Sequence, residues 1–367
     1  MRKFALFASL FVWSLLSGND DELIEIDNKL LHKEWIDGEG FTFFTENNQT
    51  FSGRGVSKDE NGSKQNESSF KDGMLHGAEK NYFPDGIICT EIQWSEGRVV
   101  GAKSWKHDGS PCNVTKVLNG DGVIKRYYAN NNTHKLSNLK GGRRHGIQEE
   151  WHEDGWKEAE GHWKDGRPEG LIIHWYDNGQ KKAEGHWKDG KQDGLGTWWY
   201  ENGQKKAEAN YKDGKEEGFG TNWYDNGQKK AEGNYKDGKE DGLTTRWYEN
   251  GKKKDESNWK DGKKDGLTTL WYDNGKKKDE SYWKDGKQDG LTTHWYDNGQ
   301  KKAEGNYKDG KQDGLAIGWY ENGQKKAEGH WKDGKQNGVS KEWYENGRKE
   351  SESNWKNGKP EGLTTRW

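Results

Sequence analysis

A 24-residue unit recurs along this chain, and residues 170–193 give it in full: Gly170-Leu-Ile-Ile-His-Trp-Tyr-Asp-Asn-Gly-Gln-Lys-Lys-Ala-Glu-Gly-His-Trp-Lys-Asp-Gly-Lys-Gln-Asp193. In every copy a Trp follows the opening glycine by five residues. The opening glycines are Gly146, Gly170, Gly194, Gly218, Gly242, Gly266, Gly290, Gly314, Gly338 and Gly362. Self-similarity at a fixed period of this length is the signature of a repeat array, in which each unit packs on its neighbours.

Each unit has the pattern of a β-hairpin. Residues 171–176 read as a short strand, and residues 181–188 read as the return strand. Asn178-Gly179 is a strong hairpin signal, because a type I′ turn needs positive φ at both central residues. Asp189-Gly190 repeats this chemistry and leads into the next unit. We therefore predict an all-β fold: an elongated, single-layer antiparallel β-meander of tandem 24-residue hairpins that forms an open solenoid.

Two-residue turns would fix which side chains share a face of the sheet. One face would carry Ile172, His174, Tyr176, Lys181, Ala183, Gly185 and Trp187. The other face would carry Leu171, Ile173, Trp175, Lys182, Glu184 and His186. The position of Gly185 holds only Gly, Ala or Ser from residue 170 onward, which lets flat rings lie over the backbone. The position of His174 changes from unit to unit, which indicates solvent exposure or a tuned contact.

The repeats divide the chain into four segments. Residues 146–367 are regular units, and residues 70–145 are degenerate units that open at Gly77, Gly101 and Gly122. Residues 20–69 read as an irregular amino-terminal cap or linker. Residues 1–19 read as a signal peptide or an amino-terminal anchor.

The amino terminus predicts export. A basic start at residues 1–3 is followed by an apolar run of 13 residues from Phe4 to Leu16. A membrane-spanning helix needs about 20 residues, whereas this length fits a secretory signal cleaved near Ser17 to Asn19. We expect a periplasmic, cell-surface or secreted protein. The alternatives are an uncleaved anchor, which is the only membrane contact we expect, and a cytoplasmic protein.

Composition excludes several classes of protein. Only 28% of residues are hydrophobic and 34% are charged, but 22 Trp, 15 Tyr and 10 Phe argue against a disordered chain. The net charge of −3 gives no reason to expect a nucleic-acid partner. Cys89 and Cys112 fall at nearly equivalent places in adjacent repeats, so their strands would lie roughly 9–10 Å apart. That separation is too large for an undistorted disulfide, so we expect two free or weakly paired thiols.

Motifs that resemble catalytic or metal sites have simpler explanations. Residues 189–194 resemble a calcium loop, but they offer two carboxylates flanked by lysines and no distal Glu, so we read them as a turn. The recurring Glu184 lies diagonal to Lys182, which favours a cross-strand ion-pair ladder over paired catalytic carboxylates. The histidines are scattered, and no catalytic motif is present. We expect no enzyme, no cofactor and no metal site.

The tryptophan of each unit is the candidate binding residue, because flat rings can stack on sugars or cover cationic groups such as choline. Rings that only pack over neighbouring Leu side chains to cover a single-layer sheet are the structural alternative. The candidate ladder is Trp151, Trp175, Trp199, Trp223, Trp247, Trp271, Trp295, Trp319, Trp343 and Trp367.

The stretch from Ala183 to Gly203 resembles the MORN repeat in its alternation of aromatic residue, glycine, aromatic residue and Asp/Asn-Gly turn. It is more similar still to the bacterial variant with the pattern WY-x-NGQKK-x-E-x-x-YKDGK-x-DG, found in YwqK-family antitoxins. The resemblance covers about four-fifths of the chain. It implies an elongated antiparallel β array used for binding, without implying an enzyme.

Three functions are compatible with these features. The first is a non-enzymatic exported protein that offers an extended binding or scaffold surface to a protein or cell-envelope partner. The second is a YwqK-type antitoxin that binds a toxin in the cytoplasm. The third is a carbohydrate- or choline-binding module that uses the tryptophan ladder. Cell location separates the first two, and a fluorescence change on ligand titration would identify the third.

Overall fold

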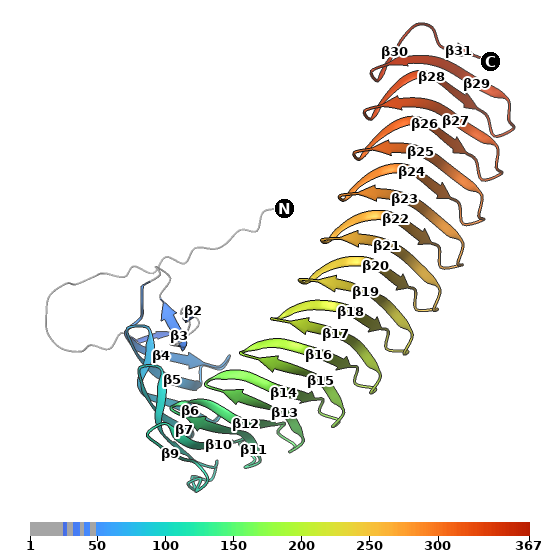
Figure 1. Cartoon of the computed structure of the whole chain (residues 1–367). Coiled ribbons are helices and arrows are strands. Elements are labelled where there is room, and N and C mark those ends of the chain that lie inside the picture. Colours follow the sequence, from blue (N-terminus) through green and yellow to red (C-terminus); the bar gives the residue numbers. More distant parts are fainter. Residues whose placement is uncertain (1–24, 28–31, 37–39, 45–48) are drawn as a thin grey trace, which may run out of the picture.

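The computed structural model describes residues 25–27, 32–36, 40–44 and 49–367. Every regular element in these residues is a β-strand. None of them belongs to a helix with the length and apolar character needed to cross a bilayer. Figure 1 shows the hairpins stacked in one long curved row, which confirms the predicted open, single-layer β-meander. The predicted signal or anchor, residues 1–19, lies outside the described residues.

Twenty-nine strands form one sheet, and β2 and β3 form a separate pair. β1 pairs in parallel with β4, and from β4 to β29 each strand pairs antiparallel with the next. The first eleven strands are β1 (Glu25–Asp27), β2 (His32–Ile36), β3 (Gly40–Phe44), β4 (Gly53–Lys58), β5 (Lys64–Lys71), β6 (Met74–Tyr82), β7 (Ile88–Ser95), β8 (Arg98–Ser104), β9 (Lys116–Leu118), β10 (Asp121–Tyr127) and β11 (Thr133–Lys140).

The remaining strands follow the 24-residue period up to β29, and both β30 and β31 pair with β29. They are β12 (Arg143–Trp151), β13 (Lys157–Lys164), β14 (Arg167–Trp175), β15 (Lys181–Lys188), β16 (Lys191–Trp199), β17 (Lys205–Lys212), β18 (Lys215–Trp223), β19 (Lys229–Lys236), β20 (Lys239–Trp247), β21 (Lys253–Lys260), β22 (Lys263–Trp271), β23 (Lys277–Lys284), β24 (Lys287–Trp295), β25 (Lys301–Lys308), β26 (Lys311–Trp319), β27 (Lys325–Lys332), β28 (Lys335–Trp343), β29 (Lys349–Lys356), β30 (Lys359–Pro360) and β31 (Thr365–Arg366).

The turn between β15 and β16 has the predicted chemistry. Asp189 has φ of 50° and Gly190 has φ of 84°, so both central residues are left-handed, as a type I′ turn requires. Lys188 pairs directly with Lys191 across the turn. The same Asp-Gly geometry recurs along the array, which keeps the register of successive repeats constant.

The loop between β14 and β15 differs from the predicted two-residue turn. The Tyr176 N–H donates to the Gln180 carbonyl at 2.9 Å, and the Gly179 N–H donates to the Tyr176 carbonyl at 2.9 Å. Only Gly179 has positive φ, at 79°. The loop therefore has three residues, with the glycine in the left-handed position that ends a type I turn. The type I′ prediction for Asn178-Gly179 is wrong.

A β-bulge compensates for the odd loop length. His174 pairs with Ala183, but Trp175 pairs with Lys181, so Lys182 is an extra residue in its strand. The extra residue restores the alternation of side chains beyond the loop. Only Lys181 and Lys182 exchange faces relative to the prediction.

The strand interiors keep their predicted faces, because Ile172 pairs with Gly185 and Ile173 pairs with Glu184. We call the side that carries Ile172, His174, Lys182, Ala183, Gly185 and Trp187 the variable face. We call the side that carries Leu171, Ile173, Trp175, Lys181, Glu184 and His186 the ladder face.

The sheet begins earlier than the sequence indicates. β4 and β5 form a hairpin in which Gly53 pairs with Phe70, as Gly146 pairs with Trp163 in the regular units. Residues 53–69 therefore belong to the sheet, inside the segment 20–69 that reads as irregular. Gly53 precedes Gly77 by one 24-residue period, but the loop and aromatic positions of this unit have diverged.

Residues 53–145, the amino-terminal region, have an aliphatic core. Ile92, Val99 and Ile124 are 2%, 4% and 5% exposed, and they pack together with Trp94, Ala102, Val117 and Leu139 around them. β10 lies against both β8 and β7, so the sheet curls around this cluster. Cys89 and Cys112 are both free thiols, as predicted.

Residues 146–367, the regular array, bury different side chains. The buried apolar residues there are Ile172 and Ala209. Small residues occupy most of the other buried positions of the variable face, among them Gly185, Gly233, Thr244, Ser257 and Thr268, while Gln148 and Asp255 are larger buried polar residues. Because half-buried rings stand beside these positions, the array holds its sheet together without an aliphatic core.

Candidate functional site

The predicted tryptophan ladder lies on the ladder face, one ring for every two strands. From Trp151 to Trp343 each ladder residue ends a strand and is half-buried, whereas Trp367 is 57% exposed. The main-chain carbonyls of most of these tryptophans accept a hydrogen bond from a tyrosine hydroxyl of the preceding unit. The Tyr176 hydroxyl, for example, donates to the Trp199 carbonyl at 2.8 Å. The ladder tryptophans therefore form part of the contact between repeats.

Lysines of the chain cover the ladder rings. Lys181 Nζ lies 5.7 Å from the centre of the Trp199 ring and 2.7 Å from Glu184 Oε2. Because the bulge places Lys181 on the ladder face, Glu184 pairs along its own strand, and the predicted cross-strand pairing with Lys182 is wrong. The same lysine-over-tryptophan arrangement recurs at Lys205–Trp223, Lys229–Trp247, Lys253–Trp271, Lys277–Trp295, Lys301–Trp319, Lys325–Trp343 and Lys349–Trp367.

This arrangement gives the ladder rings cationic partners within the chain. A cation over an exposed aromatic face contributes about 0.5–1 kcal/mol, and an exposed ion pair contributes about as much or less. Any sugar or choline group that stacked on these rings would have to displace a lysine. Ligand stacking on the ladder stays a prediction.

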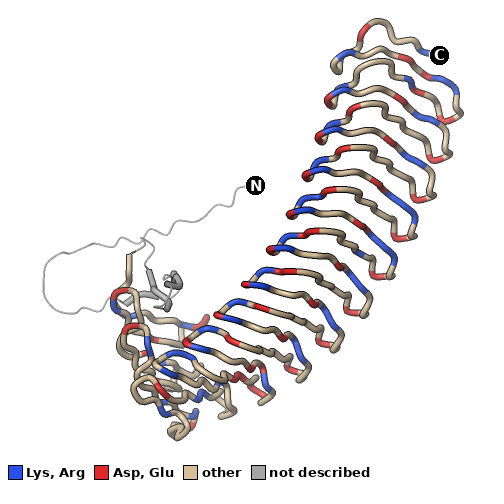
Figure 2. Tube along the Cα trace, in the orientation of Figure 1, with Lys and Arg blue, Asp and Glu red and all other residues tan. Residues whose placement is uncertain are grey.

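The acidic side chains near the Asp-Gly turns also contact neighbouring repeats. The Asp237 N–H donates to Glu217 Oε2 at 3.0 Å, and the Asp261 N–H donates to Asp241 Oδ2 at 3.2 Å. Figure 2 shows acidic and basic residues gathered along both edges of the array, where these loops and turns lie. Within the described residues, no three His, Cys, Asp or Glu side chains are placed to hold a metal ion.

The variable face carries one row of residues whose identity changes from each unit to the next. None of these residues is buried. The loops and turns keep their geometry whichever residue stands in the row, although Arg246 pairs with the buried Asp255. The identity of most of these residues can therefore serve contacts outside the chain. The row runs His174, Trp198, Asn222, Arg246, Leu270, His294, Gly318, Glu342 and Arg366.

Beside this row stands a column of half-buried aromatic rings, one for each unit. Successive rings are separated by two strand spacings, or about 10 Å, which leaves a slot between each pair. From the slot after Trp187 onward, small residues, most of them buried, form the floor of each slot. The column consists of Trp163, Trp187, Tyr211, Tyr235, Trp259, Trp283, Tyr307, Trp331 and Trp355.

Two neighbouring slots hold cations that belong to the chain. Between Tyr235 and Trp259, the Arg246 guanidinium pairs with Asp255 Oδ1 at 3.0 Å and with Glu240 Oε1 at 2.9 Å. Between Trp259 and Trp283, Lys264 Nζ lies 5.8 and 5.0 Å from the two ring centres.

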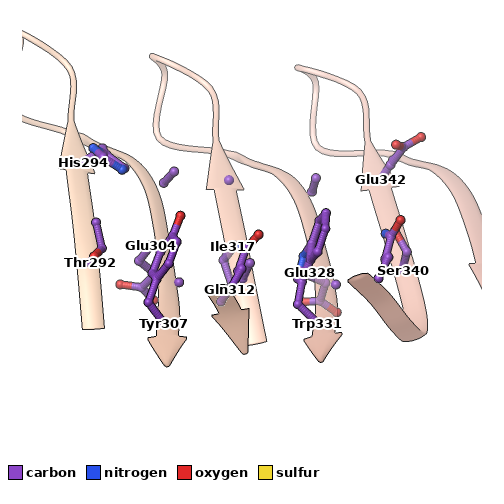
Figure 3. Close-up of a pocket in the computed structure, with 17 residues that line it drawn as sticks. Thr292, His294, Glu304, Tyr307, Gln312, Ile317, Glu328, Trp331, Ser340 and Glu342 are labelled. Carbon is purple, nitrogen blue, oxygen red and sulfur yellow. The ribbon is translucent and has the colours of Figure 1, made fainter. Parts of the chain in front are cut away.

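The slot between Tyr307 and Trp331 is open and forms the middle of a cavity of about 330 Å³ whose lining runs from β24 to β28. Figure 3 shows the two rings on β25 and β27 with Gln312 between them on β26. Gly305, Ala316 and Gly329 lie beneath the opening, and Gly318 leaves the variable row without a side chain. His294 on β24 and Glu342 on β28 lie at the two ends of the cavity, beyond the two rings. The pocket thus combines two aromatic walls with a polar rim.

A smaller cavity of about 210 Å³ occupies the slot between Tyr211 and Tyr235. There the Tyr211 hydroxyl donates to Glu216 Oε1 at 3.2 Å. Burial, reinforced by the neighbouring carboxylate, raises the pKa of Tyr211 to about 12. Trp198 stands edge-on to the Tyr211 ring at 6.0 Å and narrows this slot.

The sequence identifies the variable row but not the slots. Its signal for the larger slot is the coincidence of Gln312 and Gly318 in one unit, where one other unit places Lys264 and another places Arg246 at the matching positions. That coincidence becomes meaningful only when the pairing shows that both positions border the same two rings.

The family described as "MORN repeat variant" matches nine stretches that together exceed half of the chain: residues 144–165, 168–189, 192–213, 217–237, 240–261, 264–285, 288–309, 312–333 and 336–357. No curated protein matches the chain. Among solved structures, the chain is similar to one described as "Crystal Structure of TcdB2-TccC3-Cdc42", with 11% identity over 88% of this chain and 20% of that chain and a TM-score of 0.17. A second, "Crystal Structure of TcdB2-TccC3", has 10% identity over 89% of this chain and 21% of that chain and a TM-score of 0.15. The chain spans about a fifth of the length of those chains, and likeness at these TM-scores supports no conclusion.

Proposed function

Because the chain belongs to the MORN repeat-variant family, we propose that it is a non-enzymatic protein whose variable face is an extended binding surface for a protein or cell-envelope partner. The observation that carries this proposal is the variable row. Nine positions that share one face differ from unit to unit, while the loops, turns and aromatic column around them stay nearly constant.

The constant residues have identifiable structural roles, whereas the residues of the row vary even where they contact the chain itself, as Arg246, His294 and Glu342 do. Tyrosine hydroxyls and acidic side chains join each unit to its neighbour, and lysines cover the ladder rings. A row that served only solubility would repeat one polar residue, but this row includes Trp198, Leu270 and Gly318. Such a mixture fits a surface shaped to one partner, since specific interfaces combine aromatic, apolar and charged contacts.

Paired substitutions on the two faces of the same strands test the binding surface. His174→Ala with Asn222→Ala alters the variable face of β14 and β18, and Leu171→Ser with Phe219→Ser alters the ladder face of those strands. We expect the first pair to weaken cross-linking to a discrete partner in the producing cells, and the second pair to leave it unchanged. Loss of the partner only with the ladder-face pair would refute the assignment of the face.

Export belongs to the same proposal and rests on the apolar run from Phe4 to Leu16. The test is the intact mass and cell fraction of the full-length protein expressed with its own amino terminus. Loss of about 18 residues, with recovery outside the cytoplasm, supports export. An intact Met1 terminus in the soluble cytoplasm would instead favour the YwqK-type antitoxin role, in which the same face binds a toxin.

A further inference from the structure

We propose that the slot between Tyr307 and Trp331 is a docking site for a lysine side chain of the partner protein. This inference rests on the proposed function, since it assigns one contact of the variable face. It follows from what the chain itself places in matching slots.

The slot between Trp259 and Trp283 is an internal precedent. Lys264 Nζ lies within 6 Å of both ring centres, the range in which an aromatic face attracts a cation. Lys264 pairs directly with Trp259 across β21 and β22, so the stem enters the slot along the sheet. One ammonium group therefore lies close to the aromatic rings on both sides of this slot.

The slot between Tyr235 and Trp259 holds a second internal cation. Arg246 enters it from the variable row and pairs with Glu240 and Asp255. Asp255 is 6% exposed, so the guanidinium balances a carboxylate that is almost fully removed from water. Aromatic slots on this face thus accept cations from either side, through the Lys264 position or the Arg246 position.

Both cation positions are vacant in the larger open slot. Gln312 occupies the position of Lys264, and Gly318 occupies that of Arg246. No Lys or Arg is among the described residues that line the cavity. The rings remain, and the cavity of about 330 Å³ lies over Gly and Ala, which leaves room for an aliphatic stem.

The charges at the rim favour a cation over an anion. The Glu342 carboxylate lies at one end of the cavity, beyond Trp331, and accepts a hydrogen bond from the Ser351 hydroxyl at 2.8 Å. At the opposite end, His294 Nδ1 contacts Asp279 Oδ2 at 2.6 Å, so any charge on the imidazole is already balanced. An incoming ammonium would meet the two ring faces, while its stem would lie on the small residues below.

Two reciprocal substitutions in the full-length chain test the proposal. Gln312→Lys recreates the Lys264 arrangement and should fill the slot from within. Lys264→Gln should open a new slot between Trp259 and Trp283. The probe is the peptide acetyl-Gly-Lys-Gly-amide, and the matched control peptide carries Nε-acetyl-lysine, which lacks the charge. Isothermal titration at low ionic strength measures binding, because screening by salt weakens charged contacts.

We expect the lysine peptide to bind the unmodified chain about tenfold more tightly than the acetylated peptide, and Gln312→Lys to weaken that binding about tenfold. Lys264→Gln should raise the number of bound lysine peptides by one per chain. Melting temperatures of both variants should stay close to that of the unmodified chain, because each residue is already tolerated at the matching position.

Equal binding of the two peptides, or unchanged lysine binding after Gln312→Lys, would overturn the proposal. A neutral oligosaccharide that binds with Trp331-dependent affinity and excludes the lysine peptide would also overturn it. Partner cross-linking separates this failure from failure of the proposed function. If the variable-face pair still abolishes the cross-link, the binding surface stands without a lysine in this slot.

Discussion

The amino-terminal region and the regular array solve the same packing problem with different side chains. Ile92 faces the interior two residues before Trp94, whereas the array places Gly161 two residues before Trp163 at the matching position. Around Ile92 the sheet curls on itself and excludes water with aliphatic groups. Around Gly161 the sheet stays open, and rings cover backbone.

This difference explains where binding sites can form. A curled sheet with an aliphatic core uses its inner face for packing, so that face is closed to ligands. An open sheet whose rings lie over glycine, serine and threonine leaves the variable row and the slots accessible. The amino-terminal region therefore contributes a folded end to the array, and the array contributes the accessible face that we propose as the binding surface.

Truncation of Ile92 should have the largest effect on stability. Ile92→Ala removes most of a side chain that is 2% exposed, so we expect a loss of about 2–5 kcal/mol in unfolding free energy. Denaturant unfolding of the full chain measures it, and Val100→Ala on the exposed side of β8 is the matched control. A loss below about 1 kcal/mol would contradict an aliphatic core.

The reverse exchange, from glycine to isoleucine in the array, should lower the unfolding free energy by a smaller amount. Gly161→Ile places the isoleucine of the amino-terminal region at the matching position of the array. There a Cβ would lie 2.7 Å from Ile172 Cγ1 and 2.8 Å from Trp163 Cζ3. Overpacking of this kind costs about 1–3 kcal/mol. Gly318→Ala, whose Cβ would meet nothing closer than 3.9 Å, should change the melting temperature little. If the two variants melted alike, the rings would not need a small residue beneath them.

Replacement of two serines of the array by alanine should affect thermal stability differently. Ser257 is fully buried, and its hydroxyl has no hydrogen-bond partner among the described residues. Ser281 donates to Asp279 Oδ1 at 3.1 Å and accepts from Trp283 Nε1 at 2.9 Å. Thermal unfolding should therefore show Ser257→Ala neutral or stabilising and Ser281→Ala destabilising by about 1 kcal/mol. The same sign for both would contradict this difference in hydrogen bonding.

The smallest effect that we expect is a pH dependence of stability in the amino-terminal region. Burial lowers the pKa of His134, and the nearby cations Arg126 and Lys135 add to the shift, while Glu150 and Glu158 oppose it. Between the lowered folded pKa and the unfolded value of about 6.5, the unfolded chain binds more protons. Stability should thus fall as pH drops through this window.

Hydrogen exchange of residues 121–151 between pH 5 and pH 8 measures this dependence, because it reports the region separately from the array. His134→Asn should flatten the profile for these residues. An unchanged profile would show that the imidazole is not held in its neutral form.

The sequence predicts the fold well because the repeat makes each local signal appear many times. The Asp-Gly turn and the faces of the strand interiors follow from it directly. The exchange of Lys181 and Lys182 could not be predicted, since an Asn-Gly dipeptide suits both a two-residue turn and a three-residue loop. That single ambiguity also changed the partner of Glu184.

The candidate site was harder to predict than the fold. Its aromatic walls come from two separate units. The slot is open because neither Gln312 nor Gly318 places a cationic side chain in it. A missing side chain leaves no motif in a sequence. The prominent tryptophans of the ladder drew attention instead, although the chain's own lysines cover them.

Site-specific photo-cross-linking from the two faces of β18 tests most directly whether the variable face binds the partner. A photoreactive phenylalanine derivative replaces Asn222 on the variable face or Phe219 on the ladder face, and Phe219 is 50% exposed. We expect cross-linked adducts with one macromolecule from position 222 and none from position 219. Adducts from position 219 alone would contradict the assignment and move the binding surface to the tryptophan ladder.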